Sequence, residues 1–209
     1  MIDFCSQIFL AFTKGGLVMY PLLACSVIVV AIGIERHLYF RGANTNVEIL
    51  LETLQHSIQA SDWIEAMRIC KNTKGIAAAM LAKGLSINAT DPSYMEQALE
   101  GSATVAVAKL RYHLNYLDTI VTLAPLLGLL GTVTGMMQSF SVLAIKTGQP
   151  QAITGGVGEA LVATAAGLCV AIMALVFHSY FMHRIDAMVT DMEQVSNFLL
   201  DAAMLRFKS

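Results

Sequence analysis

Charged residues are scarce in this chain of 209 residues: Asp, Glu, Lys and Arg together make up only 13% of it. A soluble globular domain carries about 25%. Hydrophobic residues make up 56%, and the mean hydropathy is +0.63. The formal net charge of −2 argues against nucleic acid as a partner. The composition therefore indicates a membrane protein whose polar residues are concentrated between its spans.

The motifs that form sites in soluble proteins are also missing. The four cysteines, Cys5, Cys25, Cys70 and Cys169, are scattered without a C-x-x-C pair, so we interpret them as small apolar residues. The sequence contains no Walker motif, no H-E-x-x-H and no G-x-S-x-G. We therefore predict no enzyme, no metal site and no cofactor.

Three apolar segments are long enough to cross a bilayer, which takes about 20 residues. The expected fold is an all-α integral membrane protein, with the second and third helices extending into the cytoplasm as a helical bundle. The expected order is an interfacial segment (1–14), a first span (15–34), a cytoplasmic helical region (35–113), a second span (114–143), an outer turn (144–154), a third span (155–182) and a cytoplasmic C-terminal helix (183–209).

Basic residues predict the orientation of these spans. Those that flank the spans on one side are Arg36, Arg41, Lys109, Arg111 and Arg184, whereas the short turn carries only Lys146. Cytoplasmic loops carry an excess of Lys and Arg. We therefore expect the N-terminus and the turn outside, and the long loop and the C-terminus in the cytoplasm.

The predicted cytoplasmic region carries helix-start signals. Asp91-Pro92 is typical of a helix start, and no breaker follows before Pro125, so one helix is expected from Pro92 to near Leu143. Ser61 or Asp62 is a candidate N-cap for a helix with Glu65 in its first turn. An apolar stripe, comprising Ile185, Met188, Met192, Val195, Leu199 and Ala202, follows the third span. It would pack on its own subunit or between subunits.

Polar and small residues recur along one side of the second predicted span. Residues three or four apart lie on one face of a helix. The set comprises Asp118, Thr122, Pro125, Leu129, Thr132, Gly135 and Ser139. Pro125 would kink the helix or free a carbonyl, and Gly128, Gly131 and Gly135 would let a neighbouring helix pack closely.

The third predicted span combines small residues with a carboxylate. Its stripe comprises Gly156, Glu159 or Ala160, Ala163, Gly167 and Ala171. A charge within a span costs about 2.5–3.5 kcal/mol on insertion scales and usually serves function. Glu159 lies near the outer end and could instead reach the interface, and Asp118 near the inner end could be solvated. The hydroxyls of Thr132 and Thr164 could line a pore or bond to carbonyls of their own helices.

Two sequence runs in these spans resemble a known family. The run Ala-Pro-Leu-Leu-Gly-Leu-Leu-Gly-Thr-Val-x-Gly-Met at 124–136 and the run Gly-Glu-Ala-Leu-Val-Ala-Thr-Ala-Ala-Gly-Leu at 158–168 are similar to the MotA/TolQ/ExbB proton-channel family. Glu35-Arg36 after the first span also matches its pattern. Three spans with the N-terminus outside resemble ExbB and TolQ, and Thr134, where TolQ-like chains often carry Trp, is closer to ExbB.

The resemblance implies a homopentamer in the bacterial inner membrane. Its pore would enclose the single-span helices of a dimeric ExbD-like partner that supplies the proton-carrying Asp. The resemblance maps pore-lining threonines onto Thr132 and Thr164 and the membrane glutamate onto Glu159. Asp118 occupies a position where a neutral residue is expected, so its role at the pore entrance or in ring stability stays open. A TonB-like transducer would receive the mechanical work and drive outer-membrane uptake.

Three other interpretations remain open. A TolQ-type subunit for envelope integrity and constriction would use the same proton-driven mechanism but transmit the work to a different protein system. A structural membrane scaffold would carry no ion flux, and an enzyme is the remotest alternative. The residues alone favour a partner, because no carboxylate lies at mid-depth on the predicted pore face. A bare charge in hydrocarbon is too costly to cross without a titratable carrier.

Overall fold

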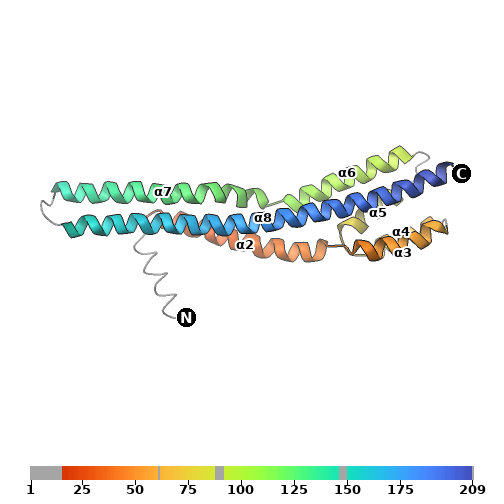
Figure 1. The fold of residues 1–209 in the computed structure, drawn as a ribbon, viewed down its shortest axis with the longest axis horizontal. Helices are drawn as coiled ribbons and strands as arrows, with labels where there is room; N and C mark the ends of the chain where they lie inside the picture. The colour runs from red at the N-terminus through yellow and green to blue at the C-terminus, as the bar shows by residue number, and fades with distance from the viewer. Residues whose placement is uncertain (1–15, 61, 88–91, 146–149, 209) are drawn as a thin grey trace, which may run out of the picture. The chain divides into compact units, whose positions relative to one another are not determined.

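The structure, a computed structural model, describes residues 16–60, 62–87, 92–145 and 150–208, and these form helices and short connections (Figure 1). The helices are α2 (Met19–Ala43), α3 (Val47–Gln59), α4 (Trp63–Asn72), α5 (Ile76–Leu85), α6 (Pro92–Arg111), α7 (Leu114–Ile145) and α8 (Pro150–Lys208). Within these ranges no strand occurs, and three helices are long and apolar enough to span a membrane. The predicted all-α membrane fold is confirmed. The predicted interfacial segment 1–14 lies outside the described residues.

Contacts divide the chain into two compact units. The spanning unit comprises Met1–Ile34 and His113–Ser179, and the extramembrane unit comprises Glu35–Tyr112 and Tyr180–Ser209. Helices α2 and α8 contribute residues to both units. In the described part of the predicted outer turn, α7 continues to Ile145 and α8 begins at Pro150.

The expected single helix from Pro92 to Leu143 is wrong. Pro92 does begin a helix, but α6 ends at Arg111 and α7 begins at Leu114. His113 between them has φ +68°, a left-handed conformation that is uncommon for a residue other than glycine. This conformation ends one series of helical hydrogen bonds, and the Tyr116 amide then donates to the His113 carbonyl at 3.1 Å to begin the next.

The extramembrane unit is built around large apolar side chains. The fully buried ones include Leu54, Leu81, Leu99, Leu110, Phe181, Ile185, Val195 and Leu199. The predicted apolar stripe of α8 is buried within this unit from Ile185 to Leu199, which favours packing on its own subunit. Its last member is corrected: Ala202 is half-buried, and Ala203 takes the buried position.

Helix caps in this unit follow ordinary side-chain chemistry. Asp62 is the N-cap of α4, because its carboxylate accepts from the Glu65 amide at 3.0 Å. The alternative residue, Ser61, lies outside the described residues, as does Asp91 before α6. Asn46 caps α3 in the same way, accepting from the Ile49 amide at 3.4 Å.

Candidate functional site

Helices α7 and α8 approach each other backbone to backbone along a line of small residues, which we term the seam. A Cβ atom added to Gly128 would lie 3.0 Å from the Cα of Thr164, and one added to Gly131 would lie 2.5 Å from the Cβ of Ala163. A Cβ on Gly167 would lie 2.5 Å from the carbonyl oxygen of Ala124. Only glycine fits at these positions without moving a helix, so the seam depends on its small residues.

The two predicted pore threonines bond to neighbouring carbonyls of α7. The Thr164 hydroxyl of α8 donates to the Gly128 carbonyl of α7 at 3.0 Å. In an α-helix that carbonyl is also the acceptor for the Thr132 amide, four residues on. The Thr132 hydroxyl donates within its own helix to the Leu129 carbonyl at 2.6 Å. Both threonines are half-buried, and their hydroxyls, which come from different helices, bond to the carbonyls of adjacent residues of α7.

The two membrane carboxylates lie apart from each other. Glu159 is half-buried and contacts Gly16, where an added Cβ would collide with its Oε1. Gly16 has φ +68°, so both backbone conformation and space favour glycine there. Asp118 is exposed near the start of α7. Since Gly135 contacts Ala160, Glu159 lies near the Gly135 level, about 25 Å along the helix axis from Asp118.

The polar and small stripe expected on the second span divides between the seam and the surface. Gly135 and Ser139 are buried in the seam, and Ser139 lies against Gly156, whereas Asp118, Thr122 and Leu129 are exposed. Pro125 and Thr132 are half-buried. The stripe repeats every 3.5 residues, and such a pattern drifts about 20° per heptad around a straight α-helix. Over three heptads, the drift turns the last members towards α8.

Pro125 lies inside α7 without ending the helix. Proline has no amide hydrogen, so the carbonyl four residues earlier loses its usual helical donor. The neighbouring backbone is contacted closely: the Ala124 carbonyl faces Gly167. The predicted packing glycines Gly128, Gly131 and Gly135 on α7 thus oppose Ala160, Ala163 and Gly167 on α8.

Arg36 has a structural role that the sequence did not reveal, because its position after a span indicated only topology. Its side chain is 4% exposed and donates to the Lys109 and Leu110 carbonyls at 3.1 and 3.4 Å. These carbonyls lie in the last turn of α6, where helical acceptors lack partners. Glu35 neutralises the guanidinium at 2.6 Å. Arg36 therefore ties α2 to the end of α6.

No cluster of His, Cys, Asp or Glu in the described ranges could hold a metal ion. Among the described cysteines, Cys25 and Cys70 are buried and Cys169 is exposed, all as free thiols. Burial raises the pKa of the Cys70 thiol to about 11. A thiol with this pKa stays protonated at neutral pH and is a poor nucleophile.

Known proteins match most of the chain. The model of the MotA/TolQ/ExbB proton channel family matches residues 72–194. Two Synechocystis sp. proteins named ExbB-like 1 and ExbB-like 3 are 36% and 31% identical, each over 170 residues. The first match covers 78% of this chain and 66% of the relative, and the second covers 80% and 81%. A Pseudomonas aeruginosa protein named TolQ is 34% identical over 104 residues, covering 47% of this chain and 45% of that protein.

Proposed function

Because this chain belongs to the MotA/TolQ/ExbB proton channel family, we propose that it is the ring-forming, ExbB-type subunit of a proton-driven membrane motor. Five identical subunits form a ring. The ring encloses a dimer of a single-span, ExbD-like partner. Proton flow along the partner drives work on a TonB-like transducer. One elementary charge falling through 100 mV yields about 2.3 kcal/mol, so several protons per cycle suffice for a mechanical step.

One observation carries this proposal. The Thr164 hydroxyl donates to the Gly128 carbonyl and the Thr132 hydroxyl to the adjacent Leu129 carbonyl, so two helices present hydroxyl groups on neighbouring carbonyls of α7. Among the described residues, the seam has no carboxylate beside these hydroxyls, since Glu159 lies towards its outer end and Asp118 is exposed near the start of α7. Hydroxyls can pass a proton but do not hold one, so a carboxylate from a partner is required. The role of Glu159 in this proposal is to shape the outer entrance and hold the ring.

Two facts favour the ExbB-type role over the TolQ-type role. The matches to the ExbB-like proteins cover 78% and 80% of the chain, whereas the match to TolQ covers 47%. Thr134 also occupies the position where TolQ-like chains often carry Trp. The TolQ-type role remains the second candidate, because the TolQ match is as identical, at 34%, over the part that it covers.

The proposed location is the bacterial inner membrane, with the N-terminus and the predicted outer turn (144–154) outside and the extramembrane unit in the cytoplasm. Cysteine labelling in a background without native thiols tests this orientation. A membrane-impermeant reagent added to spheroplasts should reach a probe at Gln149 and miss a probe at Ser86. Labelling of the probe at Ser86 but not of the probe at Gln149 would indicate the opposite orientation.

Proton flux in reconstituted vesicles tests the proposed function. The chain alone should form an oligomer, held by the glycine and alanine seam, but conduct poorly. Co-expression with a single-span, ExbD-like partner that carries a membrane Asp should give flux, and Asp→Asn in that partner should abolish it without dissociating the complex. Equal flux through the chain alone, lost in Glu159→Gln, would move the proton carrier into this subunit. If the intact complex shows no proton flux, the result would support the interpretation as a structural membrane scaffold.

A further inference from the structure

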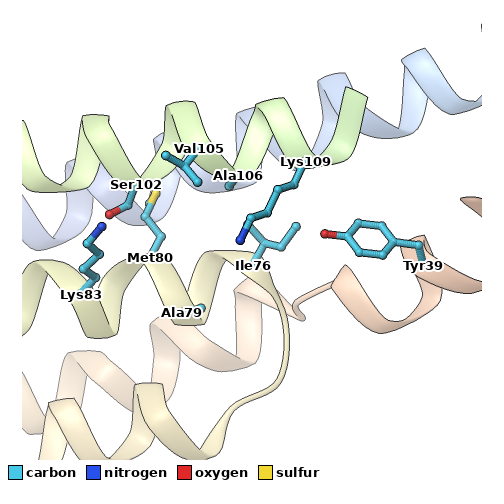
Figure 2. Close-up of a pocket in the computed structure, with 9 residues that line it drawn as sticks. All are labelled: Tyr39, Ile76, Ala79, Met80, Lys83, Ser102, Val105, Ala106 and Lys109. Atoms are coloured by element: carbon cyan, nitrogen blue, oxygen red, sulfur yellow. The ribbon is translucent and has the colours of Figure 1, made fainter. Parts of the chain in front are cut away.

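A groove in the extramembrane unit collects positive charge that nothing in the described chain neutralises. One cavity of about 240 Å³ lies between α5 and α6 and is closed at one end by Tyr39 of α2 (Figure 2). A second cavity of about 540 Å³ shares Tyr39, Val105 and Lys109 with the first. We term the two together the lysine groove, because Lys83 and Lys109 are its two lysines.

The lysine groove has the charge distribution of an anion site. Lys83 comes from α5 and Lys109 from α6, and in the described part of the chain neither makes an ion pair. Figure 2 shows the Lys83 ammonium rising towards the side of Ser102, and the Tyr39 hydroxyl directed towards Lys109. Among the residues that the structure describes, no Asp or Glu lines either cavity. Arg36 lines the second cavity, but Glu35 already neutralises it at 2.6 Å.

The floor of the groove is apolar. Ile76, Ala79 and Met80 of α5 and Val105 and Ala106 of α6 line it between the two lysines. Val105 is 53% exposed although it is a large apolar side chain. A free inorganic anion would gain no binding energy from contact with this apolar floor. The combination of two ammonium groups, two hydroxyls and apolar surface fits an amphiphile with an anionic head.

The position of the groove along α2 points to a lipid as that amphiphile. Tyr39 lies on the same helix as Ile34, the last residue of the predicted first span, and about 7 Å further along. The headgroup layer of a bilayer is about 5–7 Å thick on each side. Tyr39 and Tyr112, both in the second cavity, are residues typical of membrane interfaces.

We propose that the lysine groove binds the headgroup of an anionic phospholipid, with its phosphate held by Lys109 and Lys83 and its glycerol end on the apolar floor. Tyr39 supplies a hydroxyl donor at the Lys109 end of the groove, and Ser102 supplies one at the Lys83 end. The Ser102 hydroxyl now donates to the Ala98 carbonyl at 2.7 Å and retains its acceptor lone pairs, so a ligand would have to compete for that proton. The lysines therefore carry most of the recognition.

Native mass spectrometry of the purified full chain in detergent tests this site. Phosphatidylglycerol should bind as discrete adducts, and phosphatidylcholine with the same acyl chains should bind much more weakly. Each lysine near an anionic surface contributes about 1 kcal/mol. The double variant Lys83→Gln/Lys109→Gln should therefore lose about 30-fold in phosphatidylglycerol affinity, and Lys83→Arg/Lys109→Arg should retain it.

The matched control is Lys71→Gln/Lys74→Gln, which removes the same charge from two exposed lysines outside the groove. An equal loss in this control would reduce the effect to general electrostatics and overturn the proposal. Displacement of the lipid by free glycerol phosphate at matched concentration would assign the site to a soluble ester instead. Dissociation of the oligomer in the Gln double variant, in the absence of lipid, would assign the groove to a neighbouring copy.

Discussion

The seam between α7 and α8 and the core of the extramembrane unit are both buried, yet they use side chains of opposite size. The seam brings glycine and alanine backbones into contact, as at Gly131 and Ala163. The extramembrane core buries residues such as Leu99, Phe181 and Leu199 almost completely. Lipid tails are as apolar as leucine, so burial provides no driving force in the membrane and close packing must replace it. In water, burial of a large apolar side chain contributes about 1.5–3 kcal/mol to the free energy of folding.

Truncation of a large core residue should have the largest effect on stability. Leu199 is 1% exposed on α8, so Leu199→Ala leaves a cavity and should cost about 2–5 kcal/mol of unfolding free energy. Leu205 on the same helix is 73% exposed, and Leu205→Ala is the matched control with little expected cost. Denaturant titration of the purified chain in detergent measures both. Equal effects would remove the distinction between core and surface in this unit.

Enlargement of a seam residue should have the next largest effect. Gly167→Ala places a Cβ 2.5 Å from the Ala124 carbonyl oxygen, which is backbone and cannot rotate away, so it should cost about 1–3 kcal/mol. Gly158→Ala, on the same helix with nothing within 4 Å, should instead stabilise by up to about 1 kcal/mol through helix propensity. Thermal unfolding in detergent compares the two. Shifts of the melting temperature with the same sign in both variants would contradict backbone contact at the seam.

Removal of the hydrogen bond across the seam should have a smaller effect on stability. Thr164→Val keeps the volume but leaves the Gly128 carbonyl without its second donor. Hydrogen bonds between membrane helices contribute about 0.6 kcal/mol on average and up to about 1.7. Thr164→Ser keeps the hydroxyl and serves as the control. A loss in the Ser variant as large as in the Val variant would attribute the effect to packing of the methyl group.

Alkaline pH should affect the extramembrane core slightly and in a known direction. Because burial raises the Cys70 pKa to about 11 from 9.0, the folded state holds this proton more tightly than the unfolded state. The contribution of Cys70 protonation to the free energy of unfolding is constant below pH 9 and is lost as pH rises towards 11. In a variant that keeps only Cys70, iodoacetamide should react slowly with native protein at pH 9 and quickly after unfolding. Equal rates would show that the thiol is accessible.

The sequence predicted much of the architecture, because apolar length and helical periodicity are local properties. The three spans, the start of α6 at Pro92 and the burial of Ile185 through Leu199 all follow from such patterns. The break at His113 was missed, since Tyr112-His113 contains no Gly or Pro. The burial of Ser139 against α8 was not predicted, because periodicity identifies a face and not its partner.

The candidate site could be predicted only in part. The residues Thr132, Thr164 and Gly128 were identified from small-residue patterns and family resemblance. The hydrogen bond that joins Thr164 to Gly128 links positions 36 residues apart, and spacing within one helix carries no information about such a contact. The same holds for Glu159 and Gly16, whose contact depends on how the first helix begins.

The central claim is that the threonines of the seam are part of a proton path completed by a partner carboxylate. Proton flux through the reconstituted complex tests it most directly, with assembly of each variant verified by native mass spectrometry. Thr132→Val/Thr164→Val should lower the flux at least about tenfold, equivalent to about 1.4 kcal/mol in the barrier, while Thr132→Ser/Thr164→Ser retains most of it. Wild-type flux through an intact Val double variant would contradict the account.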